Sequence, residues 1–461
     1  MAKKKDASRA LFAEPPVTSY PYVENRLLII DWASLSYHMF HSLNSDANRK
    51  KYGLLDSEGE IELWRVKMIT RIMDYVALFN PRHVIFALEG KDAWRKKFVK
   101  EYYTEHAEVY WNKVEYYVSA DNMLYMVQKA NGGGYAVTKL KACDKAKLSE
   151  LRHRKLGEMP ADKQAMFWGI HTAKGTPILP SYKGQRKSKP WPFFTDKGVW
   201  AEYRERFAKE VAPLFRARAI QCLHAEGDDI IYASVMKYAG DCDDVIVVTR
   251  DSDLAQIKQR NVRIFNHQTS TFIVKDDPEK YLDHKVLTGD DTDNINGMAF
   301  VDTRKGKVGQ FHEGKDTQLS DGGATTLLES CPNVYETAKM HGWDGQYMRN
   351  RTLIDLSRVP AEVKKEIEQS MDMAPEPETA GGFERLDFWN VTDMVQDNYR
   401  RLQATGFYCV NSANSKIGFN AALFTKYRME AERPKISLPD NVVTADNVGL
   451  DEELSDIDVI F

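Results

Sequence analysis

Three short apolar segments of this 461-residue chain each lead into a carboxylate. The pairs are Leu27–Ile30 with Asp31, His83–Leu88 with Glu89, and Val245–Val248 with Asp251. Apolar runs of this length are typical of strands that are buried on both faces of a parallel sheet. Helical periodicity over 33–41 and 62–79 predicts crossover helices, and therefore an α/β fold. Ligands of open α/β sheets bind at the carboxyl ends of the strands, where these three acids would meet.

Further acids extend this set, at the start of an apolar helical run and after later segments. They are Glu226, Asp228, Asp229, Asp253, Asp290 and Asp293. The last two are one helical turn apart and could face one way, although such a pair alone would also suit a helix cap. A single acid after a strand is usually a loop residue, but a cluster of acids on adjacent elements would repel strongly. Divalent cations are the usual solution, so the sequence predicts a carboxylate metal site.

The net charge of −3 hides an uneven distribution of charge. When the clustered acids and the acidic C-terminus are set aside, the remaining chain is basic, as a nucleic-acid binder requires. No apolar run approaches the ~20 residues of a membrane span, and no apolar segment follows the basic N-terminus. The five cysteines are scattered without a CxxC pair. We therefore expect a reduced cytoplasmic protein without a structural zinc site.

Composition and periodicity divide the chain into segments with different expected roles. The segments are a flexible N-terminal arm (1–25), a first part of the α/β core (26–98), an insertion (99–177), a second part of the core (178–295), a helical region (296–431) and an acidic flexible tail (432–461). The insertion is rich in Tyr and Lys, and we expect a basic helical stretch over 139–155, with no chemistry assigned to it.

Two segments have the composition of phosphate-binding elements. Residues 180–189 combine an aromatic with a dense run of cations, which suits phosphate contacts and base stacking, although a solvated loop is equally typical. Residues 322–329 begin a helix at a Gly-rich turn, where backbone amides can hold a phosphate. The candidate nucleic-acid-binding residues are Lys96, Tyr182, Lys187, Gly323, Thr325 and Thr326.

Seven motifs follow one another along the chain: LIID at 28–31, FALE at 86–89, WRK at 94–96, YKGQR at 182–186, EGDD at 226–229, DSD at 251–253 and GDDTDN at 289–294. This ordered series resembles the 5′-nuclease superfamily, which contains flap endonucleases and 5′-3′ exonucleases. Within it, the chain is most similar to the ribonuclease H of T-even-like bacteriophages, including the stretch at 350–360. The resemblance covers roughly residues 26–98 and 178–370.

The resemblance implies a PIN-like parallel-sheet core with helices on both faces, then a helix-turn-helix and a helical DNA-binding region. It implies two Mg²⁺ ions, for which Mn²⁺ can substitute, held directly or through water. The first ion would lie among Asp31, Glu89, Glu226, Asp228 and Asp229, and the second among Asp251, Asp253, Asp290 and Asp293. Lys183 and Arg186, with Arg95 as a weaker candidate, would steer the scissile phosphate. The implied activity is phosphodiester hydrolysis at 5′ ends of RNA–DNA and DNA duplexes, as in primer removal during phage DNA replication.

The sequence departs from the family pattern in three places. Glu89 stands where the family usually has Asp, which shifts a ligand by about one methylene. The insertion at 99–177 interrupts the usual link to the Tyr-Lys segment. The glycine hairpin is not intact at Gly297-Met298, and residues 300–321 look inserted, so a potassium site there is in doubt.

Two other functions stay open: a non-catalytic DNA-binding module of the same fold, which would have lost acids, and a toxin-like ribonuclease with a smaller acidic site. The retained acids favour the enzyme. The acidic tail, with Ile457 and the terminal Phe461, resembles docking tags for a sliding clamp or a single-strand-binding protein, and a solubilising tail is the alternative. We expect a monomer that binds nucleic acid but no membrane, in the host cytoplasm if the chain is phage-encoded.

Overall fold

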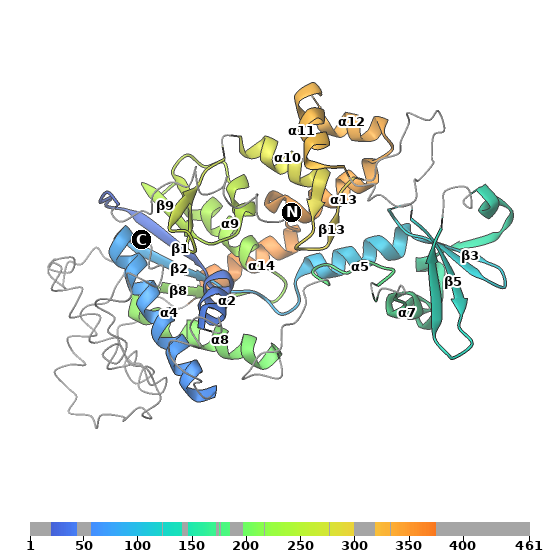
Figure 1. Ribbon diagram of the computed structural model, residues 1–461. Coiled ribbons are helices and arrows are strands. Elements are labelled where there is room, and N and C mark those ends of the chain that lie inside the picture. Colours follow the sequence, from blue (N-terminus) through green and yellow to red (C-terminus); the bar gives the residue numbers. More distant parts are fainter. Residues whose placement is uncertain are drawn as a thin grey trace, which may run out of the picture. The chain divides into compact units, whose positions relative to one another are not determined.

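The computed structural model describes residues 20–43, 57–121, 123–140, 146–171, 175, 177–184, 197–215, 217–275, 277–298, 319–331 and 333–374. The chain forms two compact units made of alternating segments (Figure 1). Unit 1 takes Met1–Lys91, Lys189–Asp276 and Pro360–Phe461, and unit 2 takes Asp92–Ser188 and Asp277–Val359. Each unit has its own sheet and hydrophobic core. The expected tail, residues 375–431 of the expected helical region, Arg186 and Lys187 lie outside the described residues.

Unit 1 is built on a six-stranded sheet in the order β11-β10-β9-β1-β2-β8. The strands are β1 (Arg26–Asp31), β2 (His83–Ala87), β8 (Ala217–Ile220), β9 (Asp244–Val248), β10 (Val262–Asn266) and β11 (Thr271–Ile273). All neighbours pair in parallel except β11, which runs antiparallel to β10. Ile30 pairs with both Phe86 and Val248, so the carboxyl ends of three strands lie side by side. The predicted α/β fold is confirmed.

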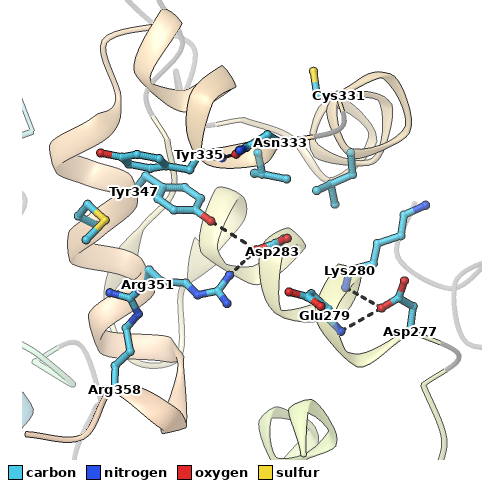
Figure 2. A pocket seen from close by; sticks show the side chains of 13 residues that line it. Asp277, Glu279, Lys280, Asp283, Cys331, Asn333, Tyr335, Tyr347, Arg351 and Arg358 are labelled. Atoms are coloured by element: carbon cyan, nitrogen blue, oxygen red, sulfur yellow. Dashed lines mark hydrogen bonds and ion pairs between the residues drawn. The ribbon is translucent and has the colours of Figure 1, made fainter. Parts of the chain in front are cut away.

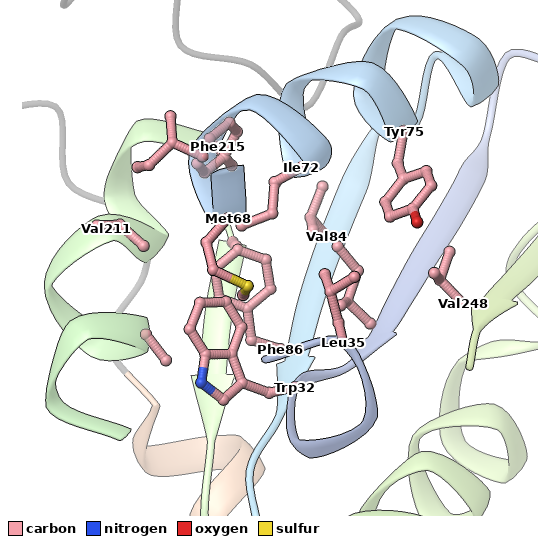
Figure 3. Packing of buried hydrophobic residues seen from close by; sticks show 14 of the residues in the cluster. Trp32, Leu35, Met68, Ile72, Tyr75, Val84, Phe86, Val211, Phe215 and Val248 are labelled. Atoms are coloured by element: carbon pink, nitrogen blue, oxygen red, sulfur yellow. The ribbon is translucent and has the colours of Figure 1, made fainter. Parts of the chain in front are cut away.

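One face of this sheet is covered by α2 (Trp32–Leu43), α4 (Ser57–Phe79) and α8 (Lys197–Val211), which continues into a 3₁₀ turn, Ala212–Phe215. In the core between the sheet and these helices, alternate strand residues pack against large helix side chains such as Trp32 and Met68 (Figure 3). The helical period predicted for α4 is confirmed, because Ile69, Ile72 and Val76 are all fully buried. Two further helices of unit 1, α9 (Gly227–Tyr238) and α14 (Ala361–Met373), contact each other, and α9 also contacts β1 and β2.

Unit 2 begins with α5 (Trp94–His106) and an antiparallel sheet in the order β6-β5-β4-β3-β7. The strands are β3 (Glu108–Trp111), β4 (Glu115–Val118), β5 (Leu124–Lys129), β6 (Tyr135–Lys139) and β7 (Arg152–Lys155), followed by a 3₁₀ turn at Leu156–Glu158 and α7 (Ala161–Gly169). The helix expected over 139–155 is wrong. Residues Ala146–Glu150 form a 3₁₀ turn whose Leu148 packs against the antiparallel sheet, and the last four residues of the segment pair with β3.

The rest of unit 2 is helical: α10 (Pro278–Thr288), α11 (Asp321–Ser330), α12 (Val334–Met340), α13 (Asp344–Ile354) and a 3₁₀ turn at Leu356–Arg358. Two-residue strands, β12 (Gly289–Asp290) and β13 (Ile295–Asn296), form a hairpin between α10 and α11. One hydrophobic cluster joins residues of α5, the antiparallel sheet, α7 and these helices, for example Tyr103, Tyr117, Phe167 and Leu353. The insertion therefore shares a core with the helical region.

A buried polar network also fixes the insertion within unit 2. Arg349 of α13 forms an ion pair with Asp121, which lies in the turn between β4 and β5. Tyr103 of α5 donates to Asp121 at 2.6 Å, and Asn296 donates to the same carboxylate at 3.2 Å. Arg349 and Asp121 are 2% and 6% exposed. Four segments of unit 2 thus meet at one buried ion pair.

The described helices include none that combines the length and apolarity needed to cross a membrane.

Candidate functional site

Asp31 ends β1 and is held in a fixed orientation. Its Oδ1 accepts the N–H of Ser34 at 2.9 Å, and its Oδ2 accepts the hydroxyl of Thr249 at 2.7 Å. The residue is 6% exposed. Burial raises the pKa of Asp31 to about 6, the two hydrogen bonds oppose the rise, and the charges of Glu89 and Asp251 add to it. Asp31 is therefore a carboxylate whose ionised form is costly in the protein alone.

Glu89 follows β2 and lies beside Asp31 at the start of α9. A Cβ placed on Gly227 would be 3.9 Å from Asp31 Oδ1 and 3.8 Å from Glu89 Cγ. The carboxylate of Glu89 is 3.6 Å from the guanidinium of Arg204, a buried residue of α8. The edge formed by β1, β2 and α9 thus brings two of the predicted acids together, as the strand order required.

Gly90 sets the turn that carries Glu89. Its N–H donates to Ala225 O at 2.8 Å. A Cβ there would lie 2.2 Å from Cys222 O, 2.3 Å from Leu223 O and 2.7 Å from Ala225 O. No side chain fits against three rigid carbonyl oxygens, so the residue after Glu89 must be glycine.

We expect Gly90→Ala to push the strand end away from the loop that precedes α9. The free energy of unfolding should fall by about 1–3 kcal/mol, as for other overpacked positions, and activity should fall with it. Thermal unfolding and steady-state rates measure the two effects. Gly132→Ala is the matched control, since nothing lies within 4 Å of its Cβ position. Equal behaviour of the two variants would contradict this account of the turn.

The acids at the start of α9 divide into two kinds. Glu226 and Asp229 form a reciprocal capping box, in which each side chain accepts a backbone N–H of the other residue. Negative charge here also interacts favourably with the positive end of the helix dipole. These two residues therefore have a structural role in starting the helix. Asp228, between them, has no part in that capping box and is partly exposed.

Asp251 and Asp253 follow β9 and lie at a 3₁₀ turn, Ser252–Gln256. Asp251 accepts the N–H of Asp253 at 2.9 Å, and its own N–H donates to the hydroxyl of Thr249 at 3.0 Å. Thr249 therefore links Asp251 to Asp31 through a single hydroxyl. This residue was not predicted from the sequence, and its position directly after a buried strand was the only signal for it.

The sequence also did not predict the residues that pack behind Ser34, which binds Asp31. The hydroxyl of Ser34 lies 2.9 Å from Nε2 of His267, which is 3% exposed and packs against His38. Burial lowers the pKa of His267 to about 3 and that of His38 to about 4, and nearby charged groups, Arg71 and Arg250 among them, add to both shifts. Both rings are neutral near neutral pH, so neither supplies a positive charge to Asp31.

The donor set of unit 1 fits a hard divalent cation, because it consists of carboxylates. The ionised form of one of them, Asp31, is destabilised by burial and by the charges of its neighbours. In the parts of the chain that are described, no three His, Cys, Asp or Glu side chains are gathered closely enough to form a complete metal site. Burial accounts for most of the raised Asp31 pKa, and the like charges of Glu89 and Asp251 add to it.

Unit 2 holds the other predicted residues, and it brings some of them together. The hydroxyl of Tyr182 donates to Asp293 Oδ2 at 2.8 Å, and the backbone N–H of Lys183 donates to Asp293 O at 2.8 Å. The ammonium of Lys183 lies 3.8 Å from the same carboxylate. Lys183 has a positive φ of 57°, a conformation that L residues rarely adopt. The Tyr-Lys segment is therefore docked on the Asp293 turn.

The expected helical relation of Asp290 and Asp293 is wrong. Asp290 ends β12 and Asp293 lies in the turn that leads to β13, because α10 ends at Gly289, which has a positive φ. The Asp290 carboxylate accepts the N–H of Asp293 at 3.2 Å and binds Lys285 at 2.7 Å. Burial alone would raise the pKa of Asp290, but the hydrogen bond and charge of Lys285, with two backbone N–H groups, lower it below its usual value. Asp290 is thus ionised and neutralised by a lysine.

Other predicted nucleic-acid contacts have structural partners. Arg95 is 2% exposed and donates to Leu353 O at 2.8 Å, so we assign it to packing, while Lys96 is exposed. The N–H of Gly323 is capped by the Ser320 hydroxyl at 3.2 Å. The hydroxyls of Thr325 and Thr326 donate to carbonyls of their own helix.

A cavity of about 780 Å³ lies among α10, α12 and α13, apart from all these residues (Figure 2). Its lining includes Lys280, Asp283, Tyr335, Tyr347, Arg351 and Arg358. Arg351 is paired with Asp283 and Asp355, and the lining mixes both signs of charge. We assign it no ligand.

Comparisons with known proteins name two kinds of relative. The chain is 22% identical over 263 residues to DNA polymerase I of Rhizobium leguminosarum, and 29% identical over 147 residues to DNA polymerase I of Lactococcus lactis subsp. cremoris. These matches cover 54% and 28% of this chain, which spans only 24% and 16% of the relatives. No family model matches the chain.

Among solved structures, the chain is similar to T5 5′-exonuclease with bound zinc, at 14% identity and a TM-score of 0.41, over 76% of this chain and 100% of that one. It is also similar to the T5 D15 flap endonuclease in a complex with DNA and metal ions, at 13% identity and a TM-score of 0.39, over 76% and 98% of the two chains. The resemblance to the T-even-like phage branch stays a prediction.

Proposed function

We propose that this chain is a metal-dependent 5′-nuclease that hydrolyses phosphodiesters at the 5′ ends of DNA and RNA–DNA duplexes. The observation that supports it most is the meeting of Asp31, Glu89 and the start of α9 at the carboxyl edge of a parallel sheet. Ligands of open α/β sheets bind at this edge. Primer removal during phage DNA replication is the biological role that the motifs favour.

The proposed metal ligands in unit 1 are Asp31, Glu89, Asp228, Asp251 and Asp253. Glu226 and Asp229 would support this site indirectly, because they cap the helix that carries Asp228. Mg²⁺ is the expected cation, because it prefers carboxylate oxygens and water, and Mn²⁺ has similar preferences. When bound, such ions supply a nucleophilic water and neutralise charge on the phosphate. Asp290 and Asp293 belong to the proposed second set, although Lys285 already neutralises Asp290.

The other residues of the chain orient these groups. The Thr249 hydroxyl and the Ser34 N–H fix both oxygens of Asp31, and Arg204 attracts the longer side chain of Glu89. Lys183 is held by its backbone and by Asp293, and its ammonium would bind the scissile phosphate, together with Arg186. Contacts to the phosphate backbone carry no sequence information, so cleavage should depend on the structure of the substrate.

The test is cleavage of a 5′-labelled nicked duplex whose 5′ segment is either RNA or DNA, with Mg²⁺ or with EDTA. Mg²⁺-dependent release of short 5′ products is expected, and the ratio of the RNA and DNA rates tells whether primers are the main substrate. Asp228→Asn combined with Asp251→Asn should lower the rate at least about a hundredfold, since even indirect partners of a metal contribute 10–100-fold. Binding of the duplex should be retained.

Glu362→Gln combined with Glu368→Gln is the matched control, because both acids are exposed on α14 of the same unit. It should cleave at the wild-type rate. Cleavage that persists in the Asp228 and Asp251 variant would refute the proposed metal site. Tight binding of the duplex without cleavage in any divalent metal would favour the alternative, a DNA-binding module of the same fold, and Glu89 would then be the first suspect.

A further inference from the structure

The last strand of the insertion, β7, presents an uncompensated row of cations. Arg152, His153, Arg154 and Lys155 are all exposed. Among the described strands, β7 pairs only with β3, so it forms an edge of the antiparallel sheet. Within the described residues, neither arginine nor Lys155 makes an ion pair, although Glu108 lies opposite Lys155 in the register. Charges on a surface are usually interspersed in sign, so a strand with three permanent cations and no acid is unusual.

Aromatic rings lie directly beside this row on the neighbouring strand. Trp111 of β3 is half-buried, and the guanidinium of Arg154 lies 5.4 Å from its ring centroid. On the same ring, the ammonium of Lys163 from α7 lies at 4.6 Å. Tyr110 packs against His153, with ring centroids 5.3 Å apart. The edge thus combines cations with aromatic rings that hold two of them, and Lys163 of α7, in place by cation–π contact and ring packing.

The edge is held in a fixed position within unit 2. The N–H of Leu156, directly after β7, donates to Ala107 O at the end of α5 at 2.8 Å. The buried pair of Arg349 with Asp121 fixes the far end of β4 to α13. The sheet also shares one hydrophobic core with the helices of unit 2. Its cations are therefore presented on a rigid support, which lowers the entropic cost of binding.

We propose that this basic edge, formed by Arg152, Arg154, Lys155 and Trp111, binds the sugar-phosphate backbone of a nucleic acid. The proposal rests on the proposed nuclease function and adds a second binding surface to it. Four strand residues span about 13 Å, and one strand of B-DNA carries a phosphate about every 3.4 Å along its axis. Successive side chains of a strand point to opposite faces, so Arg152 and Arg154 lie on one face of β7 and Lys155 on the other. At an exposed edge these long side chains can together reach about three phosphates of a strand that runs along it. A single strand and a duplex share this chemistry, and the test separates them.

The experiment measures binding of the full chain in EDTA, as a function of salt, to a labelled single strand and to a blunt duplex. The variant is Arg152→Gln, Arg154→Gln and Lys155→Gln together. If three contacts are lost, the salt dependence of log K should weaken by about 2 for a single strand or nearly 3 for a duplex. The substrate that shows the change is the one that this edge binds.

Two control variants exclude other causes. Arg152→Lys with Arg154→Lys keeps the charge and should keep the salt dependence. Lys364→Gln with Lys365→Gln removes two exposed cations of α14, and should leave binding unchanged if the effect belongs to β7. Circular dichroism and thermal unfolding establish that each variant folds.

Cations on an edge strand can also serve only to prevent pairing with another chain. In that case the triple variant would self-associate and bind both nucleic acids with an unchanged salt dependence, which would overturn the proposal. The same unchanged result without self-association, as expected of an edge that docks an acidic protein, would also overturn it. Because this test needs no cleavage, it can succeed or fail independently of the nuclease assay.

Discussion

Asp31→Asn is expected to abolish hydrolysis and, in the same variant, to stabilise the fold near neutral pH. The carboxyl has a raised pKa of about 6, whereas its ordinary value is 3.8, mainly because it is buried. A carboxyl with a raised pKa stabilises the folded state below the unfolded-state pKa, and that contribution is lost as pH rises through 6. Above that pH the ionised Asp31 costs up to about 3 kcal/mol. Asparagine does not titrate and avoids this cost.

The measurement is the free energy of unfolding in EDTA at about pH 4 and about pH 8. The difference between variant and wild type should grow by up to about 3 kcal/mol in favour of the variant. Asparagine can still accept the Ser34 N–H and can donate to the Thr249 hydroxyl, so the local hydrogen bonds survive. In the presence of Mg²⁺ the advantage should shrink, because a cation that binds only the wild type stabilises it.

Asp244→Asn is the control with the opposite expected sign. Asp244 lies at the start of β9 in the same sheet and is 1% exposed, but its carboxylate pairs with the buried Arg26 at 2.7 Å and with Arg263 at 3.2 Å. Asparagine there leaves the Arg26 charge uncompensated, which should destabilise the fold by about 3–5 kcal/mol. If Asp31→Asn has a lower free energy of unfolding than the wild type at pH 8, the ionised carboxylate does not destabilise the fold, and this prediction is contradicted.

Arg349→Met is expected to be among the most destabilising single changes in unit 2. The guanidinium pairs with Asp121, and its two NH groups also donate to Tyr103 and to Asn296 O, at 3.1 and 2.9 Å. Methionine has a similar length but leaves the Asp121 charge buried and unpaired. The cost of breaking a buried pair in this way is about 3–5 kcal/mol. Chemical denaturation measures it, and proteolysis of the insertion reports whether that sheet loosens first.

The double variant Arg349→Met with Asp121→Asn tests the reason. It removes both charges, and replacing a buried ion pair by uncharged groups is often close to neutral, so most of the lost stability should return. Arg351→Met is the matched control, because Arg351 is on the same helix but is partly exposed with its two acidic partners. If the double variant is as unstable as Arg349→Met, packing and not charge determines the loss.

The sequence determined the architecture of unit 1 because its strands are strong local signals. Leu27–Ile30 and Val245–Val248 are uniformly apolar, and such a run by itself indicates a strand that is buried on both faces. The positions of Asp31 and Glu89 at the strand ends followed from the same pattern, and their proximity followed from the parallel order. Local periodicity also predicted α4, whose end at residue 79 was correct and whose start lies five residues earlier than expected, and an apolar helical run where α9 begins.

Other features depend on contacts between residues that are far apart in the chain, and only the tertiary structure decided them. The segment at 152–155 has too few apolar residues to select a helix or a strand, and pairing with β3 makes it an edge strand. Asp290 and Asp293 have helical spacing, but the positive φ of Gly289 and the pairing of β12 with β13 place them in a turn. Thr249, Ser34 and Arg204 became relevant only once folding brought them against Asp31 and Glu89. Burial then changes their chemistry, since a side chain's pKa and hydrogen bonds depend on neighbours that its own segment does not contain.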